Sequence, residues 1–241
     1  MRLLQVFWVL LFFVSPLWGK GILCLTFDDR HFESWLYAAS LIESYGGRAT
    51  FFPSGHLTST DLEVLVTLSK RGHSIGSHSV SHKSVPEQCS NWIRRFFFLK
   101  NEIMPHVDIC SAHNIDLNCF AYPFGIHSEE SDRLLLKQFK RLRVVLRPNL
   151  IHTTDKLFVP VDTLKHTVVY PSVGIGEYYG TDVTDLRLAL QRCHEENACL
   201  ILFTHGVYES ATGTDCNISL LENILELAKS FDVTIIGMDG L

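Results

Sequence analysis

The sequence lacks the features that mark several specialised classes of protein. Its 241 residues hold 21 Lys and Arg against 26 Asp and Glu, a formal charge of −5, so the basic excess of a nucleic-acid-binding protein is missing. No internal repeat, low-complexity tract or linker interrupts the chain, and no apolar run after residue 19 is long enough to cross a bilayer. The 46% of hydrophobic residues, with 16 Phe, instead suit one folded domain with a large core.

The first 19 residues have the pattern of an export signal. A positively charged start is followed by an almost wholly apolar run over residues 3–14, and a Ser-Pro pair breaks the helix shortly before Gly19. We therefore expect cleavage after Gly19, export to the periplasm or the medium, and no stable membrane insertion of the mature domain, residues 20–241. An uncleaved signal anchor is the alternative, because the apolar stretch extends to Trp18.

The seven cysteines form no recognisable framework. Their number is odd, so at least one thiol is left unpaired, and none of them belongs to a CxxC pair of the kind that binds structural zinc. Cys110 with Cys119, and Cys193 with Cys199, are the candidate disulfide pairs.

Strand-like and helix-like patterns alternate along the mature chain. The predicted strands cover residues 22–27, 49–52, 73–77, 119–122, 142–146, 156–161, 167–169, 199–203 and 233–236. The predicted helices cover residues 33–45, 60–71, 89–104, 128–140, 184–197 and 218–230, the second of them opening with a capping box of Thr60 and Glu63. This order predicts an α/β fold whose parallel sheet is either a barrel or doubly wound.

Several predicted strands end in polar residues, and ligands of such folds bind at the carboxyl ends of the strands. The first strand ends in Asp28 and Asp29, adjacent carboxylates that point in different directions, so that one suits a metal ion and the other a proton. The third is followed by His78 and His82, whose spacing places both imidazoles on one face of a helical turn, as a shared metal ion requires. A later strand ends at His205.

Structural explanations exist for these residues as well. The Asp pair also suits the N-terminus of the next helix, and His73 is expected to pack at a strand edge and not to bind a metal. Pro and Gly in the turn at residues 120–125 can aim a backbone N–H at a developing oxyanion, or simply end the strand.

In combination, these patterns resemble the polysaccharide deacetylases of the NodB-homology type, carbohydrate esterase family 4. The resemblance covers residues 21–206 and rests on T-F-D-D at 26–29, S-H-x-x-x-H at 77–82, F-A-Y-P-F-G at 120–125 and L-F-T-H at 202–205. It implies a single-domain α/β fold, a distorted (β/α) barrel with about seven strands.

The resemblance also implies roles for individual residues. Asp29, His78 and His82 would hold a divalent metal ion. Zinc is the ion expected, with cobalt and nickel as alternatives. Asp28 would be the general base and His205 the general acid of an amide hydrolysis.

The same comparison suggests a substrate pocket. The backbone N–H of Phe124 would stand where the family has an oxyanion donor, with Tyr122 and Phe203 beside it. Asp185, or alternatively Asp182, would be the acidic residue that tunes the catalytic histidine.

The sequence departs from the family pattern at the third motif. Ala121 stands where the family has an arginine that pairs with the base aspartate. We hypothesise that Arg30, directly after the Asp pair, replaces part of the missing charge. Phe203 and Leu186 also change the apolar pocket that would hold the acetyl methyl group.

The predicted function is that of an exported metal-dependent deacetylase acting on a carbohydrate, with N-acetylated glycans favoured and O-acetyl groups as the alternative. Two other functions fit the same fold, a deformylase-like hydrolysis of another amide and non-catalytic glycan binding. The retained acid, base and metal residues favour the enzyme, because a binding protein has no need of an acid and base pair. The missing arginine favours the binding protein.

Overall fold

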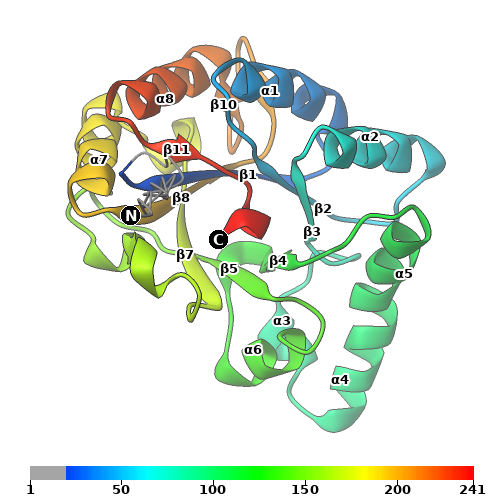
Figure 1. Cartoon of the computed structure of the whole chain (residues 1–241). Coiled ribbons are helices and arrows are strands. Elements are labelled where there is room, and N and C mark those ends of the chain that lie inside the picture. Colours follow the sequence, from blue (N-terminus) through cyan, green and yellow to red (C-terminus); the bar gives the residue numbers. More distant parts are fainter. Residues whose placement is uncertain (1–19) are drawn as a thin grey trace, which may run out of the picture.

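Seven parallel strands close into a barrel in the structure, a computed structural model that describes residues 20–241 (Figure 1). In ring order they are β1 (Ile22–Asp29), β2 (Thr50–Pro53), β3 (Ser74–Ser77), β4 (Cys119–Ala121), β5 (Arg141–Val145), β7 (Val169–Gly174) and β8 (Ala198–Thr204), and β8 pairs with β1 to close the ring. The predicted barrel of about seven strands is therefore confirmed, and the doubly wound alternative is wrong.

Two short strands extend the ring near the amino ends of its strands. β11 (Thr234–Ile235) pairs with the start of β1, and β6 (Val159–Pro160) runs antiparallel to the start of β8. The C-terminal turn η6 (Met238–Gly240) then closes the base of the barrel, where Met238 is buried and Figure 1 shows the C-terminus at the centre of the ring.

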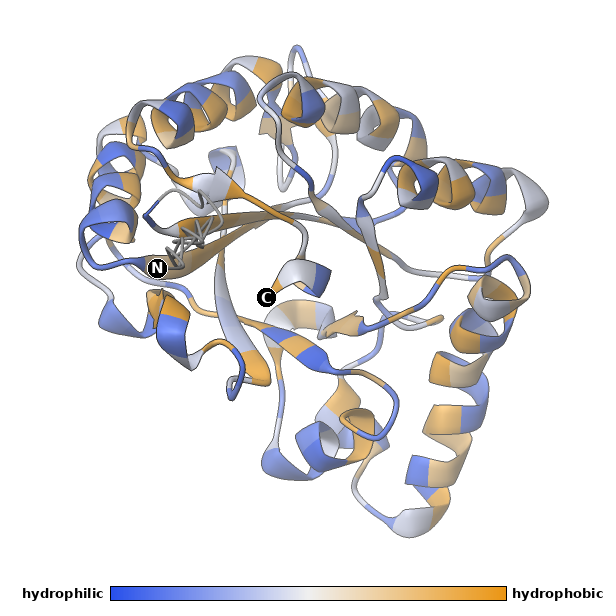
Figure 2. Ribbon diagram, in the orientation of Figure 1, coloured by the Kyte–Doolittle hydropathy of each residue, from blue (hydrophilic) through white to orange (hydrophobic). Residues whose placement is uncertain are grey.

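Helices surround the barrel. They are α1 (Phe32–Ser44), α2 (Ser59–Lys70), α3 (Val85–Gln88), α4 (Trp92–Phe98), α5 (Met104–Ala112), α6 (Glu129–Leu135), α7 (Val183–Glu195) and α8 (Ile218–Ser230). The π-helical segment η1 (Leu99–Ile103) joins α4 to α5, and a small pair of strands, β9 (Val207–Tyr208) and β10 (Cys216–Asn217), follows β8. Figure 2 shows hydrophobic and hydrophilic residues alternating along the helices, as expected of elements with one buried face.

Alternate residues of β1 face two separate cores. Leu23, Leu25 and Phe27 pack outward against the surrounding helices, whereas Ile22 and Cys24 point into the barrel. Side chains alternate along a strand, and both faces of this sheet are covered, so the strand appears in the sequence as one continuous apolar run.

Two predicted helix boundaries are wrong for identifiable reasons. The capping box of α2 uses Thr58 and Asp61, not Thr60 and Glu63; Asp61 supplies the same carboxylate on a shorter stem. The helix expected to end before Pro105 instead continues to Ala112, because the preceding π-helical segment lets the chain pass a residue that has no N–H.

Neither candidate disulfide pair forms. All seven cysteines are buried free thiols. The predicted export signal, residues 1–19, lies outside the described residues, and no helix in residues 20–241 is long and apolar enough to cross a membrane.

Candidate active site

A cavity of about 310 Å³ opens at the carboxyl ends of the barrel strands. The predicted site residues that line it are Asp28, Asp29, His78, His82, Tyr122, Phe124, Phe203 and His205. The two predicted tuning residues, Arg30 and Asp185, do not line it. The topology therefore brings together residues from four strand ends that are far apart in the sequence.

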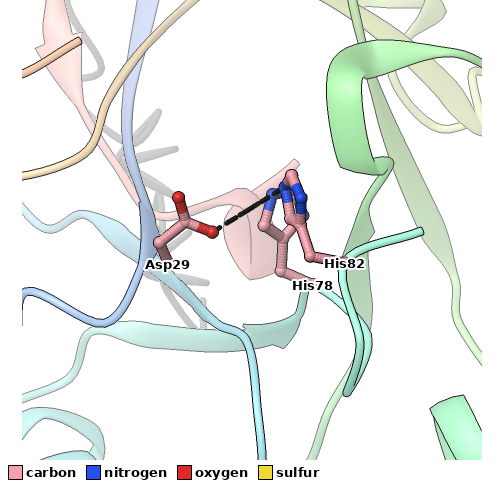
Figure 3. Close-up of side chains that lie close together, drawn as sticks. All are labelled: Asp29, His78 and His82. Atoms are coloured by element: carbon pink, nitrogen blue, oxygen red, sulfur yellow. Dashed lines mark hydrogen bonds and ion pairs between the residues drawn. The ribbon is translucent and has the colours of Figure 1, made fainter. Parts of the chain in front are cut away.

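Three of these residues converge on one point (Figure 3). Asp29, His78 and His82 each offer one ligand atom, and the three atoms lie within 4.8 Å of one another. The two Nε2 atoms are 3.1 Å apart, and each lies within 3.9 Å of the Asp29 Oδ1 atom. Two imidazole nitrogens and a carboxylate oxygen that face each other this closely form a donor set suited to one divalent cation.

The two histidines reach this point without a helix, contrary to the prediction from their spacing. His78 follows directly after β3, and His82 lies in an irregular loop with a left-handed backbone, φ 49°. Glu102 of η1 fixes this loop, since its carboxylate accepts the Ser81 N–H at 2.6 Å. Asp29 also has a left-handed backbone, φ 75°. Non-glycine residues adopt such angles only where surrounding contacts enforce them, as functional sites often do.

Hydrogen bonding sets the orientation of the His78 ring. Its Nδ1–H donates to the Ala121 carbonyl at 2.7 Å, which leaves the Nε2 lone pair directed into the cluster. Burial, reinforced by the charge of Arg143, lowers the pKa of His78 to about 4 against the opposing effect of Asp28. The ring is therefore neutral at neutral pH, the state in which imidazole binds a metal.

Asp28 lies beside this cluster and is paired with a residue that the motifs did not indicate. Its Oδ2 atom accepts a hydrogen bond from Arg143 Nη2 at 2.6 Å, and both side chains are almost completely buried. Burial alone would favour the protonated acid, but the charge of Arg143 and its hydrogen bond act against burial, and the pKa of Asp28 is lowered. The other oxygen, Oδ1, makes no hydrogen bond within residues 20–241.

The position of Arg143 corrects the hypothesis about the missing arginine. Arg143 stands on β5 directly opposite Ala121 on β4, so the charge comes from the next strand at the same level of the barrel. The small Ala121 side chain leaves room for it, and the guanidinium packs 4.6 Å from the centre of the Phe203 ring and 5.4 Å from that of Phe52.

Arg30 does not replace that charge. Its guanidinium pairs with Asp61 at 2.6 Å and donates to the carbonyls of Ser54 and His56 at 2.8 and 3.1 Å. These partners hold the side chain against the start of α2. The hypothesis that Arg30 compensates for Ala121 is therefore wrong, because nearness to Asp28 in sequence did not bring the two charges together.

His205 is held by backbone groups. Its Nδ1–H donates to the Thr214 carbonyl at 3.2 Å, and its own carbonyl accepts the Trp35 indole N–H at 3.0 Å. The Nε2 atom is left facing the cavity, 3.6 Å from Asp29 Oδ2. The Oδ1 atom of Asp29 thus faces His78 and His82, and its Oδ2 atom faces His205.

The predicted tuning role of Asp185 is wrong. Its carboxylate accepts the backbone N–H groups of Ile151 and His152 at 2.7 and 3.0 Å and the His152 Nδ1–H at 2.5 Å. Asp182, the alternative, caps α7 through the Thr184 N–H. Both acidic residues stabilise the start of α7, and Thr214 occupies the position expected of a carboxylate beside the histidine.

The three predicted pocket residues contribute in different ways. Phe124, with φ 60°, is 58% exposed, its ring lies 4.6 Å from that of His82, and its N–H makes no hydrogen bond within the described residues. Tyr122 only adds to the wall, because its hydroxyl donates to Asp132 at 2.7 Å and burial raises its pKa. Phe203 forms the floor under Arg143.

Two functional features were missed from the sequence. Arg143 left a signal, since it is a charged residue inside a strand predicted to be buried. The Thr214 carbonyl left none, because a backbone group has no signature in the sequence.

The structure is thus a (β/α) barrel with carboxylates and imidazoles at its rim. The chain belongs to the polysaccharide deacetylase family, whose sequence model matches residues 19–141. No curated protein matches the chain in sequence.

Solved structures share the fold at low sequence identity. A family 4 carbohydrate esterase from Streptomyces lividans is 14% identical, with 90% of this chain and 92% of that one covered and a TM-score of 0.58. The chitin deacetylase from Colletotrichum lindemuthianum is 15% identical, with 92% and 87% covered and a TM-score of 0.62. A pseudoenzyme of the same family from Bacillus anthracis is also 15% identical, with 92% and 65% covered and a TM-score of 0.55.

Proposed function

We propose that this protein is a metal-dependent deacetylase that removes acetyl groups from a carbohydrate chain by hydrolysis, with N-acetyl groups as the favoured substrate. One observation carries the proposal. An ionised carboxylate with a free oxygen, Asp28, and a histidine with a free Nε2, His205, flank the cluster of Asp29, His78 and His82. Amide hydrolysis requires such a base and such an acid on the two sides of the bond that breaks.

The cluster supports the metal requirement. His78 is neutral and its Nε2 lone pair points to His82, so a divalent ion would replace the contact between the two Nε2 atoms and leave the hydrogen bond from His78 Nδ1–H to Ala121 in place. Two imidazoles and one carboxylate favour zinc, with cobalt and nickel as alternatives. The chemistry that such an ion supplies is polarisation of the acetyl carbonyl and activation of water.

The protein groups perform the proton transfers. Asp28 Oδ1 accepts the proton of the attacking water, while Arg143 holds Oδ2 and keeps the carboxylate ionised and fixed. The free N–H of Phe124 donates to the oxygen that gains charge as the acetyl carbon becomes tetrahedral. His205 Nε2 then donates a proton to the leaving amine, and the Thr214 carbonyl stabilises the imidazolium through Nδ1–H. The products are acetate and a free amino sugar.

Non-catalytic glycan binding remains the rival, since a pseudoenzyme shares the fold. The main argument for it from the sequence was the missing arginine at residue 121. Arg143 supplies that charge from the opposite position on β5, and this favours the enzyme.

Acetate release from a panel of N- and O-acetylated oligosaccharides tests the proposal, with N-formyl sugars added to detect deformylation. The zinc-loaded protein should release acetate, and the Asp28→Asn variant, which keeps the three metal ligands, should not. Absence of acetate from every substrate, with one zinc bound per chain, would reject the deacetylase. Binding to the same panel would then identify a glycan-binding protein.

Export is part of the proposal and rests on the apolar pattern of residues 1–19. Expression of the full chain in a bacterial host tests it. A secreted or periplasmic product that begins at Lys20 is expected, and a chain that keeps its first residues in the membrane fraction would support the signal anchor instead.

A further inference from the structure

Strand β5 delivers a second arginine to the cavity. Arg143, Val145 and Arg147 are spaced by two residues, and all three line the cavity. The Leu146 N–H donates to the Ser172 carbonyl at 2.8 Å, so the pairing with β7 continues one residue past the end of β5. Because side chains alternate along extended backbone, the two arginines lie on one side of the strand, one deep in the barrel and the other at its rim.

The two arginines differ in their partners. Arg143 is neutralised by Asp28, whereas no carboxylate of residues 20–241 lies within ion-pair distance of the exposed Arg147, and its side chain makes no hydrogen bond to them. The cavity contains only one other carboxylate, Asp29, which faces the histidines. Arg147 is therefore a cation at the rim of the cavity with no counter-ion in the described part of the chain.

Arg147 also lines a second, neighbouring cavity. The neighbouring cavity, again about 310 Å³, shares Arg147, Tyr178 and Tyr179 with the first. Tyr179 sits directly on Gly174, where a Cβ atom would lie 2.4 Å from its ring, and it packs edge-on to the 59% exposed Tyr178. The tyrosine pair forms an aromatic wall of the kind that sugar rings contact, next to the arginine.

We propose that Arg147 binds an anionic group, a carboxylate or a sulfate, on the sugar adjacent to the one that is deacetylated. The inference rests on the proposed function and narrows it to acidic N-acetylated glycans. An arginine without an internal partner presents its planar fork of N–H donors to the ligand, a geometry that matches a carboxylate or a sulfate and that a neutral sugar satisfies only in part. Because Arg147 lines both the cavity that holds Asp28 and His205 and its neighbour, we assign this contact to the sugar next to the one that is deacetylated.

Binding of matched tetrasaccharides tests the inference. The probes are one that alternates N-acetylglucosamine with glucuronic acid, the same molecule with its carboxyl groups reduced to alcohols, and N-acetylglucosamine tetramers with and without sulfate. Dissociation constants are measured by calorimetry at low and high salt for the wild type, Arg147→Gln and Arg147→Lys. Arg187→Gln is the control, because it removes another exposed arginine without a carboxylate partner among residues 20–241, and this one lies on α7 and lines neither cavity.

The wild type should bind the carboxylate or the sulfate probe about 10- to 100-fold more tightly than its neutral counterpart. Which probe is preferred identifies the anion. Arg147→Gln should abolish the preference, Arg147→Lys should keep part of it, and Arg187→Gln should keep all of it. Equal affinity for charged and neutral probes in the wild type, or an unchanged preference in Arg147→Gln, would overturn the inference.

Acetate release from the same probes separates this inference from the proposed function. Deacetylation of the neutral tetramer without any preference for charge would reject the role of Arg147 and leave the deacetylase intact. A preference for the charged probe that depends on Arg147, with no acetate from any probe, would reject the deacetylase and leave the anion site.

Discussion

Arg143 donates to Asp28 at 2.6 Å from the position directly opposite Ala121. Parallel strands in register place side chains of paired residues side by side on the same face of the sheet. An arginine on either of two neighbouring strands can therefore reach the same carboxylate. The exchange of a large for a small residue also preserves the packing inside the barrel. With Ala121 in its third motif, the chain thus still has an arginine paired with Asp28, the proposed base.

The first prediction exchanges the two residues. Arg143→Gln should lower kcat/KM, because Asp28 loses the cation that keeps it ionised and oriented. The decrease should approach the roughly 10²- to 10⁴-fold that a positioned base contributes. The double variant Ala121→Arg/Arg143→Ala should recover a large part of the loss. Kinetics on an acetylated oligosaccharide, with zinc content and thermal unfolding in parallel, provide the measurement.

A pH profile separates this electrostatic role from a merely structural one. The pKa of Asp28 lies below its usual value in the wild type, and loss of the Arg143 charge should raise it. The acid limb of kcat/KM should therefore move to higher pH in Arg143→Gln and back toward the wild type in the double variant. An acid limb at the same pH in all three proteins would contradict the role of Arg143.

The second prediction concerns the metal. His78→Ala and His82→Ala should each weaken zinc binding by more than the roughly 10- to 100-fold that the loss of a ligand's hydrogen-bond partner costs, since each removes a ligand itself. Zinc content after dialysis against a chelator is the measurement. His166→Ala is the matched control, because the side chain of this exposed histidine makes no hydrogen bond or ion pair within the described residues. Equal zinc in His78→Ala and the control would remove the basis for the metal site.

Much of the fold and of the site could be predicted because the relevant signals are local. Apolar runs gave the strands of the barrel, and Asp28, Asp29 and His205 could be placed at the rim because each ends a strand or directly follows one. The partner of Asp28 could not be found in this way. Arg143 is 115 residues away in the sequence, and only the closed ring of strands brings the two together.

Local spacing also misled in one case. The interval between His78 and His82 suggests a helical turn, yet an irregular loop with strained backbone, tied down by Glu102, brings the rings together. Spacing alone cannot distinguish these conformations, because contacts with residues elsewhere in the chain stabilise the strained loop.

The third prediction separates Arg30 from Arg143. Arg30→Gln should lower the free energy of unfolding by about 1 kcal/mol, since it breaks the contacts of a partly exposed arginine with Asp61 and two carbonyls. It should leave kcat/KM within about twofold of the wild type, because none of those partners lines the cavity and Arg30 contacts only the carbonyl of Ser54, not the hydroxyl that reaches Asp29. Urea unfolding and steady-state kinetics give the two numbers. A loss of activity comparable to that of Arg143→Gln, at unchanged stability, would restore the rejected hypothesis about Arg30.

The fourth prediction concerns Glu43, the carboxylate that pairs with His73 and Arg71. His73 is buried, accepts the Ala49 N–H through Nδ1 and meets Glu43 through Nε2 at 3.0 Å, while Arg71 binds the same carboxylate at 2.9 Å. The hydrogen bond from Arg71, with that from His73, lowers the pKa of Glu43 to about 2 from an ordinary value of 4.5.

A group whose pKa is lowered by folding stabilises the folded state at every pH above its ordinary pKa, and this contribution is lost as the pH falls toward the lowered value. Glu43→Gln should therefore reduce the free energy of unfolding by about 1 kcal/mol at pH 7, and the difference from the wild type should shrink between about pH 4.5 and pH 2. Urea unfolding at pH 7, 4 and 2.5 measures it, with the exposed Glu63→Gln as control. A difference that stays constant down to pH 2.5 would show that the Glu43 side chain acts through its shape and not through its charge.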